Sequence, residues 1–121
     1  MERVSFITVE TGDDLILSFA VQRPDDAAEI ESLILMRTPK YEFIFEEYER
    51  GVKVSFERHD DDEDDLLQKF EYADGEAMIR IRTASREFEL DVRKVDAADL
   101  KKMRAILRKM NYDQKFETSG V

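Results

Sequence analysis

Few side chains in this 121-residue chain have types that suit catalysis. The one imidazole, His59, opens an acidic run that we expect to form a loop, a poor place for the fixed pairing of nucleophile and base that nucleophilic catalysis uses. The chain has no cysteine, so thiolate nucleophiles and thiolate metal ligands are excluded. Its four glycines stand singly, whereas a phosphate-binding loop needs them clustered. We therefore expect no catalytic residue and no enzyme activity.

The acidic run that follows His59 has the residue types of a calcium site. An EF-hand loop counted from Asp60 would have Glu71 at its twelfth position, but its sixth position is Asp65, where the sharp turn needs glycine. Paired carboxylates elsewhere cannot be told apart by sequence, because a chain with 29 acidic residues contains many chance pairs. We expect no bound metal and no cofactor, and we predict that residues 59–65 form a solvated loop.

Charge is the feature that most restricts the function class. Acidic residues number 29 and basic residues 19, which gives a net charge of −10. Residues 1–65 hold 19 acidic and 7 basic side chains, a net charge of −12, whereas residues 66–121 hold 10 and 12, a net charge of +2. Such a field repels phosphate backbones and anionic lipid and attracts cationic surfaces. We predict a basic protein partner, and we expect neither membrane association nor direct nucleic-acid binding.

Aromatic and acidic residues gather between positions 41 and 57. We expect the phenylalanines of this region to lie in the core. Tyr48 is the better surface candidate, because strand alternation places it opposite Phe43 and Phe45. A tyrosine rimmed by carboxylates suits an interface anchor for a basic partner. The predicted partner-binding residues are Glu46, Glu47, Tyr48, Glu49, Asp60, Asp61, Asp62, Asp64 and Asp65.

The elements that must position these residues are mostly strands, because apolar and polar residues alternate along most of the chain. The predicted strands are residues 3–8, with Val4 and Phe6 on one face, and 15–21, 32–37, 41–46, 52–57, 66–72, 77–83 and 87–93. The strongest hairpin signal joins 41–46 to 52–57 through a turn that contains Gly51. The apolar run within 32–37 predicts a strand buried on both faces, and a helix stays open as an alternative for 66–72.

The period changes near the C-terminus. Leu100, Met103, Leu107 and Met110 recur at intervals of three and four, which predicts one amphipathic helix. Asp96 suits the N-cap, with Asp99 three residues later as a carboxylate capping box. We predict an α+β fold of about eight antiparallel strands in hairpins with this helix packed on the sheet. A single domain would span residues 1–112, followed by a flexible tail at 113–121.

The order of these elements resembles that of a known family. A hairpin at residues 12–19 precedes an apolar strand, 33–37, that ends in arginine. A central strand at 52–57 and a closing strand at 88–92, which leads into the helix, complete the layout. This arrangement is similar to that of the small bacterial immunity proteins that neutralise polymorphic toxins, in particular the tenth family of that group. The resemblance implies binding and inhibition of a cognate toxin, and it assigns no individual site residue.

We therefore predict a non-catalytic acidic binding module, in particular an immunity-type inhibitor of a basic toxin or effector. Two alternatives stay open: a small acidic secretion or assembly chaperone, which would form a homodimer, and a nucleic-acid mimic whose carboxylates imitate phosphates. Residues 1–4 do not resemble a secretory signal, and no apolar run approaches ~18 residues. We expect a cytoplasmic protein.

Overall fold

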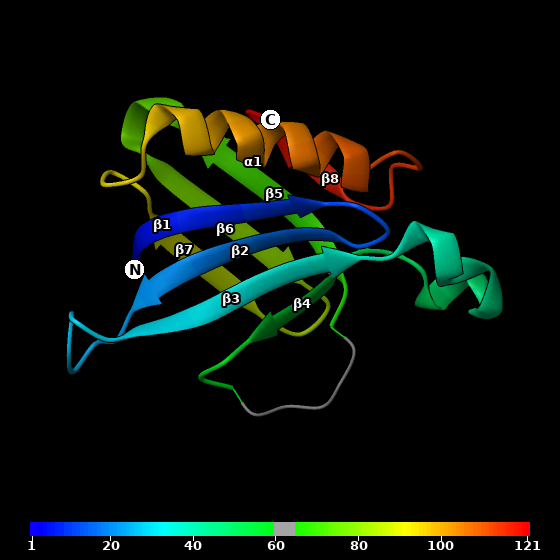
Figure 1. The fold of residues 1–121 in the computed structure, drawn as a ribbon, viewed down its shortest axis with the longest axis horizontal. Coiled ribbons are helices and arrows are strands. Elements are labelled where there is room, and N and C mark those ends of the chain that lie inside the picture. Colours follow the sequence, from blue (N-terminus) through cyan, green and yellow to red (C-terminus); the bar gives the residue numbers. More distant parts are fainter. Residues whose placement is uncertain (60–64) are drawn as a thin grey trace.

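The computed structural model describes residues 1–59 and 65–121. These residues form a sheet of eight strands with one main helix packed on it, the predicted α+β fold (Figure 1). The strands are β1 (Glu2–Thr11), β2 (Leu15–Gln22), β3 (Ile30–Arg37), β4 (Lys53–Phe56), β5 (Leu67–Ala73), β6 (Met78–Thr83), β7 (Glu87–Asp91) and β8 (Glu117–Ser119). The α-helix is α1 (Ala97–Met110), and three short 3₁₀ helices are η1 (Pro39–Ile44), η2 (Glu47–Glu49) and η3 (Asp74–Glu76).

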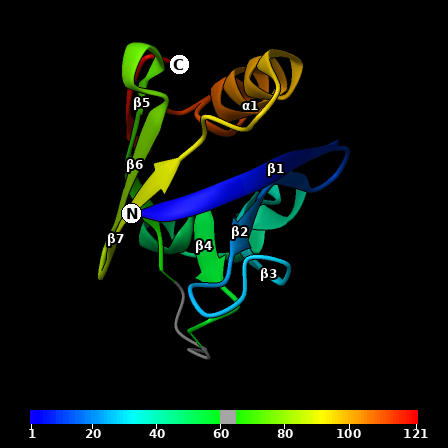
Figure 2. The same cartoon turned by 90° about the vertical axis from the view of Figure 1, so that its left-hand side faces the viewer.

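The sheet consists of two antiparallel meanders joined in the middle. Its strand order is β4-β3-β2-β1-β7-β6-β5-β8, and only the β1/β7 and β5/β8 pairs are parallel. The other side of β4 meets the chain just before β5, where the Val54 N–H donates to the Asp65 carbonyl at 2.8 Å and Lys53 forms an isolated bridge with Leu66. Figure 2 shows the two meanders set at an angle to each other. The sheet therefore curves around the apolar core instead of lying flat.

The helix closes the core along the stripe predicted for it. Met103, Ile106, Leu107 and Met110 are all buried, and α1 packs on β1 and β2. Asp96 occupies the N-cap position, but its side chain makes no capping hydrogen bond, so the predicted capping box is wrong. The strand predicted at 66–72 is confirmed as β5. Among the described residues, no helix is both long enough and apolar enough to cross a membrane.

Two strands differ from the predicted pattern of burial. The β1/β2 register shifts between Val4 and Phe6, and this irregularity turns Phe6 outward while Val4 and Ile7 are buried. In β3, alternate residues point inward and Met36 is 38% exposed, so the prediction of a strand buried on both faces is wrong. The outer face of β3 is therefore open to solvent near Met36.

The prediction of a strand at 41–46 is also wrong. Residues 38–50, which we call the 3₁₀ segment, contain η1 and η2 instead. Pro39 occupies the first turn of η1, where its fixed φ suits a helical start. β4 pairs with β3 and so takes the sheet edge that a strand at 41–46 would have needed. Figure 1 shows the 3₁₀ segment projecting beyond the end of β3.

The prediction of a flexible tail at 113–121 is also wrong. β8 pairs with β5, and Phe116 is buried in the core. The Asn111 side chain holds the turn before β8, donating to the Phe116 carbonyl at 3.0 Å and accepting from its N–H at 3.3 Å. Gly120 has a φ of +74° and leaves no room for a Cβ beside the Tyr72 carbonyl. The packed domain therefore extends well beyond residue 112.

Candidate functional site

Large apolar side chains are exposed together on the 3₁₀ segment. Tyr41, Phe43, Ile44 and Tyr48 are between 49% and 79% exposed. They account for four of the nine large hydrophobic residues that are exposed in the described part of the chain. Isolated exposed apolar residues are common, but a cluster of them marks an interaction site. This cluster is the candidate functional site.

Three exposed glutamates border the cluster. Glu46, Glu47 and Glu49 lie in or beside η2 together with Tyr48, so this part of the predicted site is brought together at the surface. The Glu49 carboxylate accepts a hydrogen bond from the Glu46 N–H at 3.3 Å. Phe43 was expected in the core and instead lies at the surface, because residues 41–46 are not a strand and do not alternate between two faces.

The 3₁₀ segment is fixed to the domain by Arg37, the last residue of β3. The Arg37 side chain is 0% exposed. Its Nε and Nη2 donate to the two carboxylate oxygens of Glu42 at 2.8 and 2.9 Å. Its Nη1 and Nη2 donate to Asp113 at 2.8 and 2.7 Å, and Nη1 also donates to the Met110 carbonyl at 2.7 Å. All five guanidinium N–H groups are therefore used, so Arg37 serves the structure and has no donor left for a ligand.

Electrostatic attraction stabilises the group formed by Arg37, Glu42 and Asp113, which we call the Arg37 cluster. Burial by itself lowers the pKa of Arg37, but hydrogen bonds to Asp113 and Glu42 outweigh it and raise that pKa above its usual range. The hydrogen bond from Arg37 lowers the pKa of the Asp113 carboxyl. The Tyr112 ring lies 4.4 Å from the guanidinium carbon and covers it. A buried arginine thus joins η1 to the segment that follows α1.

A second, exposed contact joins the same two regions. Lys115 donates to a carboxylate oxygen of Glu47 at 2.7 Å and to its carbonyl oxygen at 3.3 Å. This hydrogen bond lowers the pKa of Glu47. The 3₁₀ segment is therefore tied to the C-terminal region at both η1 and η2.

Sequence reasoning missed Arg37, Glu42 and Asp113 as the base of this site. A signal was present, because Arg37 follows Leu33 and Leu35 with the period of two that places all three on the buried face of β3. A buried arginine requires carboxylate partners. The sequence does not show which of the 29 acidic residues supply them.

The acidic run contributes differently from what was predicted. Asp60, Asp61, Asp62 and Asp64 lie outside the described residues. Asp65 is 7% exposed, and its carboxylate accepts hydrogen bonds from the Thr83 hydroxyl at 2.5 Å and from the Ser85 N–H at 3.1 Å. The prediction of a solvated loop is therefore wrong for Asp65, which fixes the turn between β6 and β7.

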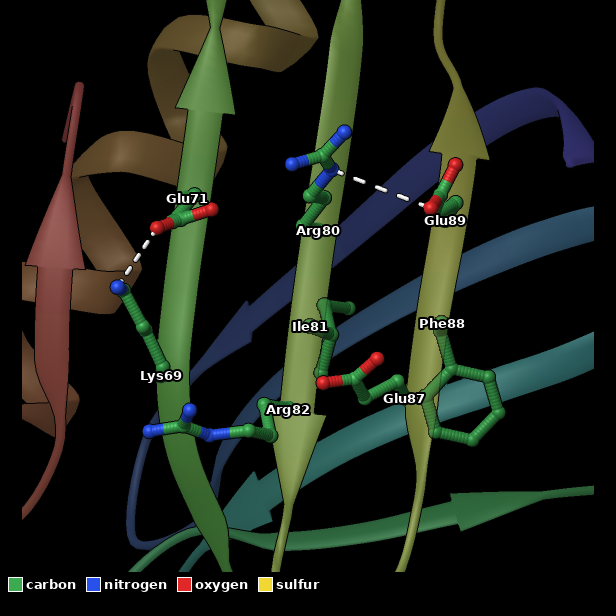
Figure 3. A pocket seen from close by; sticks show the side chains of 8 residues that line it. All are labelled: Lys69, Glu71, Arg80, Ile81, Arg82, Glu87, Phe88 and Glu89. Carbon is green, nitrogen blue, oxygen red and sulfur yellow. Dashed lines mark ion pairs between the residues drawn. The ribbon is translucent and has the colours of Figure 1, made fainter.

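A second group of charged side chains covers the outer face of β5, β6 and β7. Figure 3 shows this group, which we call the outer ladder: Lys69, Glu71, Arg80, Arg82, Glu87 and Glu89. Lys69 pairs with Glu71 at 2.8 Å and lowers the pKa of that carboxyl, and Arg80 lies 4.0 Å from Glu89. The ladder lines a shallow hollow of about 310 Å³. Its three basic and three acidic groups balance one another, so it presents no net charge to a ligand.

His59 has no partner arrangement typical of a catalytic base among the described residues. The His59 ring lies at the surface with its centroid 5.3 Å from that of Phe56, in an edge-on contact. Across residues 1–59 and 65–121, no cluster of three or more histidine, cysteine, aspartate or glutamate side chains is arranged to hold a metal ion.

Comparison with protein-family models finds no match, and comparisons with curated proteins and with solved structures find no significant one.

Proposed function

We propose that this chain is a non-catalytic binding module that takes a basic protein partner on its 3₁₀ segment. The observation that carries the proposal is the exposed cluster of Tyr41, Phe43, Ile44 and Tyr48 with glutamates at its edge. Aromatic side chains that lose contact with water on binding dominate interface energies. Carboxylates around them steer a cationic surface into place and exclude acidic competitors.

The anchoring of the segment supports this function. Binding costs less when the surface is already ordered, because fewer side chains and backbone dihedrals must be immobilised. Arg37 holds η1 through Glu42, and Lys115 holds η2 through Glu47. The aromatic cluster is therefore presented on a braced support even though it projects from the sheet.

We further propose that binding is inhibitory, as the resemblance to immunity proteins implies. The 3₁₀ segment would cover the functional surface of a basic toxin or effector in the cytoplasm. A chaperone role would require a homodimer, which sedimentation of the purified chain detects directly.

The test is affinity capture from native extract at low and high salt with three forms of the chain. The wild type is compared with the double variant Phe43→Ala/Tyr48→Ala and with the control Phe6→Ala, which removes an exposed aromatic ring from β1. We expect the wild type and the control to retain a basic protein, more strongly at low salt because exposed charge contacts are screened by salt. The double variant should lose it, since truncating one hot-spot aromatic costs about 2 kcal/mol, roughly 30-fold in Kd.

Equal retention by the double variant and the control would contradict the proposed site. Retention of acidic proteins only would contradict the proposed partner chemistry. Retention that depends on Phe43 and Tyr48, followed by a direct assay in which the chain abolishes the activity of the purified partner, would support the inhibitory role.

A further inference from the structure

A hollow of about 300 Å³ lies where the 3₁₀ segment meets β3 and β4. Its apolar walls come from Met36 on β3, Tyr41 in η1 and Phe45 just after η1. Met36 and Tyr41 are 38% and 49% exposed, so part of each wall faces solvent. The hollow is thus next to the exposed cluster and is formed by the same anchored segment.

The polar groups at the base of the hollow are already satisfied. Arg37 and Glu42 line it, but they are bonded to each other and to the C-terminal region. Asp14 accepts a hydrogen bond from the Thr38 hydroxyl at 2.6 Å. Within the described residues, no buried side-chain nitrogen or oxygen lacks a partner. The hollow therefore offers contact area to an apolar group, and no polar group in it requires a hydrogen bond from that group.

Acidic side chains stand on two sides of the hollow. Asp13 and Asp14 lie in the turn between β1 and β2. Asp14 lines the hollow itself, whereas Asp13 is paired with Lys40 at 3.3 Å. Glu49 lines it from η2, where Glu46 and Glu47 are its neighbours. One cation lines it as well: Lys53 on β4, whose Nζ lies 5.1 Å from the centroid of the Phe45 ring. A segment laid across the hollow would therefore meet Asp14 on one side of its central residue and Glu46 and Glu49 on the other, and basic residues at those positions would complement them.

We propose that this hollow receives one large apolar side chain from a partner segment whose flanking residues are lysine or arginine. This inference rests on the proposed function, because it specifies how the basic partner is anchored. The apolar side chain lies between Met36 and the rings of Tyr41 and Phe45, and the flanking cations face Asp14 on one side and Glu46 and Glu49 on the other. The anchor provides most of the affinity, and the cations provide orientation and association rate.

The test uses two blocked peptides, Lys-Lys-Trp-Lys-Lys and Lys-Lys-Ala-Lys-Lys, added to the full chain. Because the chain contains no tryptophan, fluorescence from the first peptide reports only on its own environment. The second reporter is the Met36 methyl group in protein labelled with ¹³C at its methionine methyls, with Met78 on β6 as the internal control. We expect the tryptophan peptide to bind roughly 10-fold or more tighter, the gain from burying a large apolar side chain. Its emission should shift to shorter wavelength, and Met36 should shift while Met78 does not.

Two variants separate this site from the rest of the surface. Met36→Ala removes one wall and should reduce the preference for the tryptophan peptide, whereas Met78→Ala should leave it unchanged. Equal affinity for the two peptides, an unmoved Met36 signal, or no binding of either peptide would overturn the inference. If capture of a basic protein still depends on Phe43 and Tyr48 in that case, the proposed function stands without the hollow. If that dependence is absent too, both fail.

Discussion

Two groups of charged side chains in this molecule have the same chemistry and different surroundings. In the Arg37 cluster, the guanidinium is fully buried and all of its N–H groups are bonded to Glu42, Asp113 and the Met110 carbonyl. In the outer ladder, Arg80 is 58% exposed and lies 4.0 Å from Glu89 (Figure 3). A buried charge that loses its partner cannot turn to water, whereas an exposed one can. Burial, not residue type, therefore decides which charges fix the backbone.

The comparison also separates support from recognition. The buried cluster lies beneath the 3₁₀ segment and connects it to the end of α1. The glutamates that we propose to meet a partner lie at the exposed end of the same segment. The guanidinium that holds η1 has no capacity left for a ligand, whereas Glu47 both anchors η2 through Lys115 and belongs to the exposed acidic group.

The largest effect is expected from Arg37→Met. This change keeps an unbranched side chain but removes the guanidinium and leaves Glu42 buried without a cation, so we expect the free energy of unfolding to fall by about 3–5 kcal/mol. The matched change in the outer ladder, Arg80→Met, should lower it by less than about 1 kcal/mol. Urea unfolding measures both. Similar losses for the two variants would remove the distinction that we draw between the two groups.

An intermediate effect is expected on the pH dependence of stability. Arg37 lowers the pKa of Asp113 in the folded state below that of an ordinary aspartate. The stabilisation is therefore complete above the pKa of the unfolded chain and is lost as the pH falls through the lower pKa of the folded state. Asp113→Asn should make the acid side of the stability curve shallower than in the wild type.

Unfolding followed across the acid pH range tests this prediction, with Glu71→Gln as the control. Glu71 has its pKa lowered in the same direction by Lys69, but both members of that pair are about one third exposed and solvent screens them. The Asp113 variant should therefore alter the curve more. A larger change for Glu71→Gln would show that the pH-sensitive contact lies in the outer ladder and not at Arg37, which would contradict the prediction.

The smallest effects are expected from two half-buried lysines at the surface. Lys115→Ala breaks the contact with Glu47, and Lys69→Ala breaks the contact with Glu71. Because surface ion pairs contribute little and are screened, each variant should unfold within a few degrees of the wild type, and the difference should vanish at high salt. Thermal scans at two salt concentrations measure this. A salt-independent loss confined to Lys115→Ala would show that η2 needs its own anchor in addition to Arg37.

Much of the fold followed from local patterns. The stripe of α1 and the alternation in β2, β6 and β7 predicted those elements, because neighbouring residues in one element share a periodicity whatever packs against them. The exposure of Glu46, Glu47, Tyr48 and Glu49 also agreed with the sequence. The prediction was wrong where local pattern and pairing disagreed, at Phe6, at residues 41–46 and at 113–121.

The sequence by itself determined the α+β class, the excess of negative charge and the absence of thiol chemistry, since these depend on composition and on neighbours along the chain. The tertiary structure alone decided that residues 41–46 become 3₁₀ turns, because β4 occupies the edge of β3. It also decided that Arg37 meets Asp113, 76 residues away. A contact between distant residues depends on how the whole core closes, and no local period encodes it.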